Sequence, residues 1–251
     1  MNSPLFRADR FLTRFTDRAP LPLKAARGVV SFTFDDAPLS ACQAGAAALE
    51  HHGARGTWYV AGGLTDGAEL GRPCHTESAL RELLAAGHQL GCHTWSHVEV
   101  NRIDRARRTG ELDRNRDWLA GLGVNLETLD FAYPLGGVSI GAKHDCAGRF
   151  RSSRSTGRGA HIGSADLNAL KTHRFYRGAP EAGAYPERLA QTAAQRGWLI
   201  LNTHEVADDA GPYGCSPTEL RTAIGQALDA GCLVLPVTAA LDYLKKAAAA
   251  V

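Results

Sequence analysis

Short apolar runs alternate with segments of helical periodicity along most of this 251-residue chain. Apolar runs of four to eight residues are typical of strands buried on both faces, and the segments between them are long enough for crossover helices. The alternation predicts a parallel α/β sheet or barrel. The expected strands are Val29–Phe34, Thr57–Val60, Gln89–His93, Leu129–Tyr133, Trp198–Asn202 and Cys232–Val237. The expected helices are Leu39–His52, Glu77–Ala86, Asp104–Gly121, Pro186–Arg196 and Pro217–Ala230.

The organisation along the chain indicates one main domain. No repeat or low-complexity linker interrupts the alternation, so we expect a single domain over residues 28–251 and an N-terminal extension, residues 1–27, that packs on it. The segment Gly136–Arg177 is rich in glycine, serine and arginine, which predicts irregular loops with one short strand near Phe150. Ser216 is expected to cap the helix that follows it.

Charge and composition exclude several classes of partner. The formal net charge is only +2 and hydrophobic residues make up 44% of the chain, which is ordinary for a globular protein. Neither nucleic acid nor an anionic membrane is therefore an expected partner. The arginines between Arg102 and Arg108 are interpreted as the solvated face of a helix.

The cellular location is predicted from two features that the sequence does not show, a transmembrane stretch and the apolar run of a signal peptide. No stretch approaches the roughly 20 apolar residues of a transmembrane helix, and charges between Arg7 and Arg14 break any apolar run of a signal peptide. The six cysteines form no C-x-x-C pair and are expected to be free thiols. These features predict a cytoplasmic protein, and they leave its oligomeric state unspecified.

Two polar motifs follow expected strands and have the composition of a metal site. Asp35 and Asp36 come directly after a buried run, where carboxylates are costly unless they are paired or bind a metal. His93 and His97 are four residues apart and can converge on one ion. Imidazole with carboxylate favours zinc, cobalt, nickel or manganese over calcium. Each motif alone also has an ordinary explanation, a helix cap or a chance pair among ten histidines.

Two further motifs lie at strand ends. His204 follows the run Trp198–Asn202, and Pro134 is followed by Leu135 and two glycines that predict a turn with exposed backbone N–H groups. Taken separately, His204 is explained as a half-buried histidine that caps a strand, and the turn at Pro134 carries no functional signal. Polar side chains at several strand ends together are typical of a barrel active site.

The order of these motifs resembles the NodB-homology polysaccharide deacetylases, carbohydrate esterase family four. The matching motifs are Thr33–Asp36, His93–His97, Tyr133–Gly136 and Thr203–His204, and the resemblance extends from about Val29 to Val237. It implies a distorted (β/α) barrel of seven to eight mainly parallel strands, not a closed TIM barrel.

The resemblance also implies a role for each matching residue. It assigns one divalent metal ion, most commonly Zn²⁺ with Co²⁺, Ni²⁺ or Mn²⁺ as alternatives. The implied roles are metal ligand for Asp36, His93 and His97, catalytic base for Asp35, general acid for His204, and oxyanion donor for the backbone N–H of Leu135.

The chain departs from the family pattern in three places. Many members have an arginine at the position of Ala132, which pairs with the catalytic base, and we expect Arg154 or Arg151 to replace it. Leu135 stands where tyrosine is frequent, a change that keeps the backbone donor. The usual motif that supports the acid histidine is missing, and Asp166 is the candidate in its place.

A further loop, Asp208–Cys215, resembles one found after the histidine in a bacterial branch of the family. We expect it to shape the substrate end of the site, with Tyr213, Pro134 and Trp95 lining it. Trp95 is equally explained by core packing behind the ion. Cys215 is interpreted as a packing residue, because no base is placed to ionise it.

The expected function is a metal-dependent hydrolase that removes N-acetyl groups from an amino-sugar-containing saccharide through metal-activated water. A deformylase or cyclic-ureide amidohydrolase on the same fold is an alternative, as is a non-catalytic carbohydrate-binding relative. Alanine at position 132 favours the last slightly, and the complete set of site residues disfavours it. The saccharide itself is left open among oligosaccharides, nucleotide sugars and lipid-linked precursors.

Overall fold

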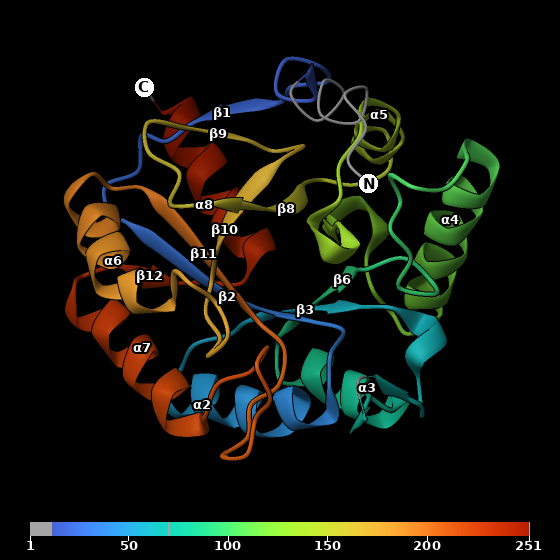
Figure 1. Cartoon of the computed structure of the whole chain (residues 1–251). Helices are drawn as coiled ribbons and strands as arrows, with labels where there is room; N and C mark the ends of the chain where they lie inside the picture. Colours follow the sequence, from blue (N-terminus) through green and yellow to red (C-terminus); the bar gives the residue numbers. More distant parts are fainter. Residues whose placement is uncertain (1–11, 70, 251) are drawn as a thin grey trace.

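Seven parallel strands form a closed ring in the computed structural model, which describes residues 12–69 and 71–250 (Figure 1). They are β2 (Val29–Asp35), β3 (Thr57–Val60), β6 (Gln89–Cys92), β7 (Phe131–Ala132), β8 (Ser153–Arg158), β10 (Leu170–Arg174) and β11 (Trp198–Thr203). They are neighbours in this order, and β11 pairs with β2 to close the ring. The predicted barrel is confirmed, with seven strands in its ring where a TIM barrel has eight.

An eighth strand, β12 (Leu233–Val234), shares one edge of β2 with β3. β11 occupies the other edge of β2 over almost its whole length, from Val29 to Phe34. β12 therefore pairs with the start of β2 and β3 with its end. Every residue of β2 and β11 is buried, which explains their continuous apolar runs, because the strands of a parallel barrel are covered on both faces.

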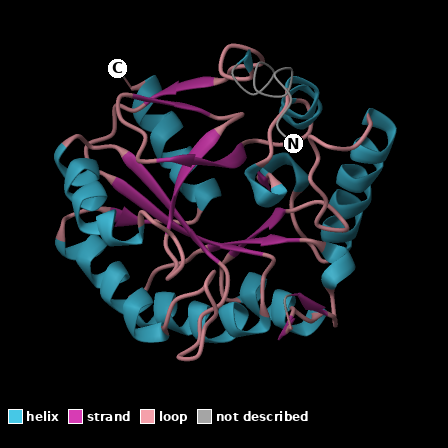
Figure 2. Cartoon of the chain, viewed as in Figure 1, coloured by secondary structure: helices cyan, strands magenta, loops and turns pink. Residues whose placement is uncertain are grey.

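Helices surround the ring on its outside (Figure 2). They are α2 (Ala46–His51), α3 (Glu77–Ala85), α4 (Arg105–Gly121), α5 (Ile140–Ala147), α6 (Tyr185–Ala194), α7 (Pro217–Asp229) and α8 (Val237–Ala249). Shorter helical segments are η1 (Ala41–Gly45), η2 (Gly62–Leu64), η3 (Leu126–Thr128), η4 (Pro134–Gly136) and η5 (Ala182–Ala184). The predicted cap is present: Ser216 accepts from the backbone of Glu219, whose side chain accepts from the backbone of Ser216.

Two parts of the chain differ from their prediction. The segment Gly136–Arg177 is not irregular, because it supplies α5 and two strands of the ring, β8 and β10. These strands carry polar residues where the others carry apolar ones, so their hydrophobic pattern is weak. The second difference is the predicted final strand, Cys232–Val237. In the structure its strand part is only Leu233–Val234, and α8 already begins at Val237.

The N-terminal part of the described chain packs against the end of the barrel that holds α8. Strand β1 (Pro20–Pro22) pairs antiparallel with β9 (Ser164–Asp166), and Leu21 lies in one apolar cluster with α8. Lys143 of α5 also donates to the backbone oxygen of Thr13 at 2.9 Å. The predicted extension over residues 1–27 stays a prediction, and its first eleven residues lie outside the described part. Between β3 and α3 the chain forms a small antiparallel pair of strands, β4 (Ala68–Glu69) and β5 (Arg72–Pro73).

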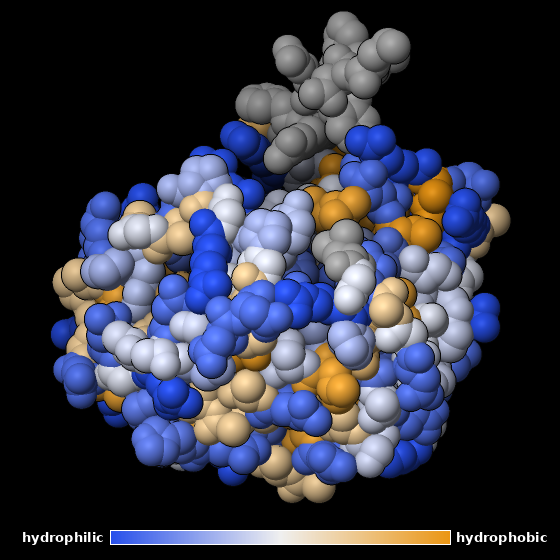
Figure 3. Space-filling model, turned by 60° about the horizontal axis from the view of Figure 1, so that its bottom comes forward, coloured by the Kyte–Doolittle hydropathy of each residue, from blue (hydrophilic) through white to orange (hydrophobic). Residues whose placement is uncertain are grey.

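The hydropathy of the surface is seen on one face of the molecule (Figure 3). Figure 3 shows one face on which hydrophilic side chains predominate and apolar ones are scattered in small groups. Within the described residues, no helix is both long and apolar enough to cross a bilayer. The six cysteines are free, as predicted, and all are buried.

One of the helix arginines expected in solvent is buried instead. Arg108 of α4 is 7% exposed and donates to Asp145 of α5 from Nη2 at 2.6 Å and from Nε at 2.9 Å. Asp145 itself is 3% exposed. The ion pair therefore links α4 to α5, a contact that no feature of the sequence predicts.

We expect Asp145→Asn to lower the free energy of unfolding by about 3–5 kcal/mol at neutral pH, because it leaves Arg108 buried without its charge partner. Burial raises the pKa of Asp145, but the hydrogen bonds and charges of Arg108 and Arg105 outweigh it and lower the pKa below its usual value. The contribution of Asp145 is thus present above its unfolded pKa and is lost as the pH falls through the lower folded pKa.

Urea unfolding of both proteins at neutral and acidic pH measures this effect, and the gap between them should narrow at acidic pH. Asp113→Asn is the matched control, because its ion pair with Arg149 is half-exposed and is worth at most about 1 kcal/mol. Equal losses in the two variants would contradict the role given to the buried pair.

Candidate active site

The polar motifs lie together at the carboxyl ends of the barrel strands. Asp35 ends β2, His93 follows β6, and His204 follows β11. Parallel strands place these ends at one side of the barrel, where barrel enzymes carry their chemistry. All three residues line one cavity of about 360 Å³, which also contains Asp36 and His97.

Asp36, His93 and His97 form a group able to hold a metal ion. Oδ1 of Asp36 lies 3.1 Å from Nε2 of His97 and 3.5 Å from Nε2 of His93, and the three ligand atoms are within 4.8 Å of one another. Asp36 Oδ1 is buried and has no hydrogen-bond partner among the described residues. A buried, unpaired carboxylate oxygen facing two imidazole nitrogens fits a divalent cation of the zinc type.

Surrounding groups orient these side chains. Nδ1 of His93 lies 2.8 Å from the carbonyl oxygen of Ala132, so an Nδ1–H donates there and Nε2 is left to face the ion. Burial lowers the pKa of His93 to about 4, which keeps the ring neutral as a ligand must be. Glu69 lies 3.6 Å from Nδ1 of His97, and His75 contacts the backbone oxygen of Asp36 at 3.3 Å.

Asp35 is held by two residues from the barrel interior. Arg154, which is 1% exposed, forms an ion pair with Oδ1, and Nδ2 of Asn202 lies 3.4 Å from Oδ2. The Arg154 guanidinium packs over the ring of Tyr59 at 4.8 Å. Burial raises the pKa of Asp35, but the charge and the hydrogen bond of Arg154 contribute most to the opposing effect, so that the pKa is below its usual value.

The structure thus brings Arg154 to Asp35, and it does not bring Arg151 there. Arg151 points to the outside, where it pairs with Asp242 of α8. Arg151 comes just before β8 and Arg154 lies within it. Because successive side chains of a strand point to opposite faces, two arginines three residues apart have side chains that point in different directions. The expectation that Arg151 supports Asp35 is wrong.

We expect Arg154→Gln to lower kcat roughly 10- to 100-fold, the usual effect of removing an outer partner of an active-site group. Glutamine keeps a donor near Asp35 but removes the charge, so Asp35 loses its fixed orientation. Steady-state kinetics measure the effect, with metal content as a second reading that should stay unchanged. Arg151→Gln is the control, and equal losses in both variants would contradict the assignment.

His204 is oriented by a backbone carbonyl. Its Nδ1 lies 3.2 Å from the oxygen of Tyr213, and its Nε2 faces Oδ2 of Asp36 at 3.8 Å. The rings of Tyr213 and Tyr176 lie 5.7 and 5.9 Å from the His204 ring and 5.7 Å from each other. The support predicted from Asp166 is not found.

Asp166 has a structural role instead. Its carboxylate binds Nζ of Lys143 at 2.8 Å and accepts from the backbone N–H groups of Ala19 and Asn168. It therefore ties β9 to the N-terminal segment and to α5. The prediction that it supports the acid histidine is wrong.

Residues with left-handed backbone conformation gather at the site. Positive φ values occur at Asp36 (63°), Ala37 (49°), Thr94 (64°), His97 (52°) and Leu135 (55°). Such conformations are costly for residues other than glycine, and they accumulate where a site requires them. Here they turn the chain directly after β2, β6 and β7, so that the side chains and the Leu135 backbone face the cavity.

The residues predicted to line the substrate region divide into two groups. Tyr213 and Leu135 line the cavity, with exposed fractions of 46% and 70%. Trp95 packs instead against Trp118 at 6.0 Å, under the guanidinium of Arg114. Pro134 is buried in its turn. Neither is among the residues that line the cavity, so both predictions are corrected.

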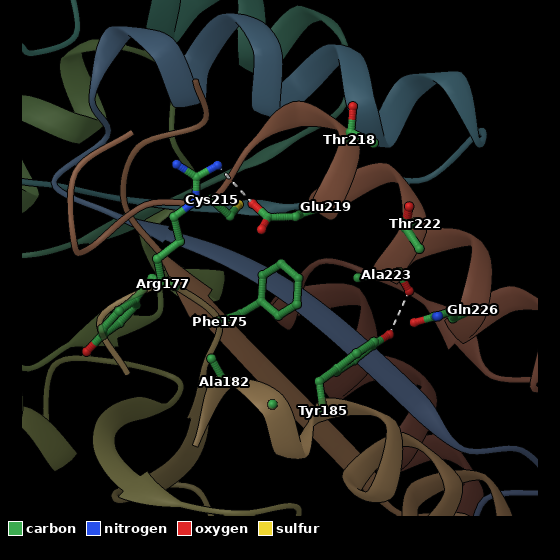
Figure 4. Close-up of a pocket in the computed structure, with 12 residues that line it drawn as sticks. Phe175, Arg177, Ala182, Tyr185, Cys215, Thr218, Glu219, Thr222, Ala223 and Gln226 are labelled. Carbon is green, nitrogen blue, oxygen red and sulfur yellow. Dashed lines mark hydrogen bonds and ion pairs between the residues drawn. The ribbon is translucent and has the colours of Figure 1, made fainter. Parts of the chain in front are cut away.

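A second cavity, of about 410 Å³, adjoins the first across Tyr176, which lines both. Figure 4 shows the ring of Phe175 pointing into it between Arg177 and Tyr185. Its one arginine is paired, with Arg177 Nη2 3.4 Å from Glu219. Cys215 lies in its wall, buried, and burial raises the pKa of the thiol to about 12, in keeping with a packing role.

Several residues of the site were not predicted from the sequence. Glu69, His75 and Asn202 contact the metal group or Asp35, and Arg174 lines the cavity while paired with Glu181. Asn202 was within reach of sequence reasoning, because it is polar in an otherwise apolar strand just before His204. The others come from segments without recognisable motifs.

Fold and site together define a barrel enzyme with its chemistry at the carboxyl ends of the strands. The family described as polysaccharide deacetylase matches residues 23–144 of this chain. A chitin deacetylase from Pestalotiopsis sp is 29% identical over 82 residues, which cover 33% of this chain and 26% of that protein. This segment is about a quarter of the length of that relative.

Solved structures show the same fold. The deacetylase PplD of Streptococcus pyogenes, in complex with acetate, is 24% identical with a TM-score of 0.55 and covers 65% of this chain and 69% of its own. The peptidoglycan deacetylase PdaC of Bacillus subtilis is 16% identical with a TM-score of 0.59, covering 88% and 93%. The chain is thus similar to the polysaccharide deacetylase family over residues 23–144, and to these solved deacetylases in fold.

Proposed function

We propose that this protein is a metal-dependent hydrolase that removes N-acetyl groups from a saccharide containing amino sugars. One observation carries the proposal: the carboxylate of Asp35 lies in the same cavity as the converging ligand atoms of Asp36, His93 and His97. Two adjacent carboxylates can then have different roles, one as a ligand and one as a base.

The metal ligands would be Asp36, His93 and His97, and the ion is proposed to be Zn²⁺ because the donor set is two nitrogens and one oxygen. A divalent ion bound there supplies Lewis-acid chemistry, polarising the acyl oxygen and acidifying the attacking water. The unpaired Oδ1 of Asp36 supports this proposal, since burying it without a cation is costly.

Asp35 is proposed as the base. Each of its oxygens has one partner, Arg154 or Asn202, and a carboxylate has capacity for further hydrogen bonds. Its lowered pKa keeps it ionised at neutral pH, ready to take the proton of the attacking water. Arg154 holds the Asp35 carboxylate in place and its charge offsets the cost of burying that carboxylate. Arg154 would thus replace the arginine that many family members have at the position of Ala132.

His204 is proposed as the general acid. With an Nδ1–H donating to the Tyr213 oxygen, a protonated ring presents its Nε2–H to the cavity, where the leaving nitrogen would lie. The backbone N–H of Leu135 is proposed as the donor to the developing oxyanion, which its position in the cavity wall and its left-handed backbone support. The exposed side chains of Leu135 and Tyr213 offer apolar surface to a sugar ring at the mouth.

Acetate release from chitooligosaccharides and from peptidoglycan fragments, measured with the metal-loaded protein, tests the proposal. We expect release that stops after chelation and returns with added Zn²⁺. Formate release from formylated sugars in place of acetate would indicate a deformylase. Metal binding without hydrolysis of any of these would indicate a carbohydrate-binding protein and contradict the proposal.

A further inference from the structure

A basic cavity adjoins the catalytic cavity on the side of β8 and β10. It has a volume of about 500 Å³, within the usual range of small-molecule sites, and Gly136 and Thr156 line both cavities. Gly136 has φ +70°, and a Cβ there would lie only 2.0 Å from Oγ1 of Thr156. Gly136 and Thr156 are therefore in close contact and form a wall that the two cavities share.

The side chains of this cavity are strongly unbalanced in charge. Four are cationic, Arg14, Arg18, Arg158 and Lys171, and the only acidic one among the described lining residues is Asp166. Asp166 is already occupied by Lys143 at 2.8 Å and by two backbone N–H groups. It therefore does little to neutralise the four cations.

The remaining partners do not restore the balance. Arg158 lies 3.7 Å from Glu181, a carboxylate already held by Arg174 through two contacts. Arg18 and Lys171 form no ion pair with an acidic residue in ranges 12–69 and 71–250, and both are exposed. Among the described residues, the positive charges of Arg18 and Lys171 thus lie beside the catalytic cavity without an acidic partner.

This arrangement differs from an ordinary solvated surface. Cations in a concave site focus their field on its interior and raise the local concentration of anions. Thr156 also lines this cavity, and its hydroxyl group can donate a hydrogen bond to an anion. The neighbouring cavity across Tyr176 gives the contrast, since its arginine is neutralised by Glu219 (Figure 4).

We propose that the basic cavity is a phosphate-binding subsite, and that the substrate is an N-acetylated amino sugar carrying a phosphate or diphosphate ester. This inference rests on the proposed function, because it names the substrate class of that site. Arginine and lysine bind phosphoryl oxygens by charge-assisted hydrogen bonds, and Arg18, Arg158 and Lys171 together suit a multiply charged diphosphate better than a single carboxylate. The ester would be part of a soluble nucleotide sugar or of a lipid-linked saccharide.

Calorimetric titration of inorganic pyrophosphate into the metal-loaded full chain tests the subsite without any catalysis. We expect binding that weakens at least roughly 10-fold in the double variant Arg18→Gln/Lys171→Gln, the scale of losing a charged hydrogen bond. Both side chains are exposed, so the fold should be retained, and thermal unfolding verifies this. The control Lys24→Gln/Lys245→Gln makes the same charge change elsewhere and should bind like the wild type.

Two results would overturn the subsite. One is no pyrophosphate binding to the wild type. The other is equal affinity in the wild type and Arg18→Gln/Lys171→Gln, which would place the anion on the metal ion, since both proteins hold it.

Acetate release then separates the two sources of phosphate. We expect kcat/KM for UDP-N-acetylglucosamine, or for N-acetylglucosamine diphosphate lipid in vesicles, to exceed that for the neutral disaccharide. The ester with the higher kcat/KM shows whether the phosphate belongs to a nucleotide sugar or to a lipid-linked saccharide. In Arg18→Gln/Lys171→Gln, the ratio of kcat/KM for that ester to kcat/KM for the neutral disaccharide should fall at least roughly 10-fold. A neutral sugar hydrolysed as well as both esters would contradict the substrate class. Pyrophosphate binding with no acetate released from any sugar would instead contradict the proposed function.

Discussion

Replacing Asp35 with asparagine is expected to lower kcat by roughly 10²- to 10⁴-fold, the scale of losing a general base. Asparagine has nearly the same shape and can still contact Asn202, but it cannot take a proton. Because Asp35 is not among the three converging ligands, the bound metal should remain at wild-type stoichiometry. Steady-state acetate release and metal analysis of the same preparation measure the two quantities.

The variant also removes the charge partner of Arg154, a buried cation. Breaking such a pair costs about 3–5 kcal/mol of stability, so a thermal unfolding curve must accompany the kinetics. The double variant Asp35→Asn/Arg154→Met removes both charges and should restore stability without restoring activity. Full activity of either variant at full metal occupancy would sink the assignment of the base.

The second large effect is expected in His97→Ala, which removes one of the three ligand atoms. Its affinity for Zn²⁺ should fall by more than the roughly 10- to 100-fold typical of losing an outer partner, because a direct ligand is lost. His97 side chain is partly exposed, so this change disturbs the core less than replacement of the buried His93. Activity should fall in parallel with metal content.

Metal analysis after dialysis, with a competing chelator to measure affinity, checks this result. His51→Ala is the control, because His51 is exposed at the end of α2 and contacts only His52 among aromatic rings. Wild-type zinc affinity in His97→Ala would contradict the metal site. A comparable loss in both variants would show that the effect is not local.

The apolar strands were predictable because their pattern is set by burial. β2, β3 and β11 lie within one residue of the predicted runs, since each is covered on both faces and must be apolar throughout. β8 and β10 were missed for the converse reason. Arg154 of β8 points into the site to meet Asp35, and a strand that serves a polar interior has no apolar signature.

The site divides in the same way. The order of Asp35, Asp36, His93, His97 and His204 along the chain was enough to predict where they meet, because the ends of parallel strands converge whatever lies between them. Their supporting contacts were not predictable. His93 depends on the backbone oxygen of Ala132 and His204 on that of Tyr213, and a carbonyl contact leaves no trace in residue type.

By itself, the sequence predicted a parallel sheet or barrel and its main apolar strands, because periodicity is a local property of the chain. The choice of a barrel and the roles of the site residues came from the resemblance that the motif order carries. Only the tertiary structure decided that Arg154 and not Arg151 faces Asp35, that Asp166 holds Lys143, and that four cations from separate segments surround one cavity. Such pairings depend on which distant side chains the closed ring brings within a few ångströms. That geometry follows from the packing of the whole barrel, and no single segment encodes it.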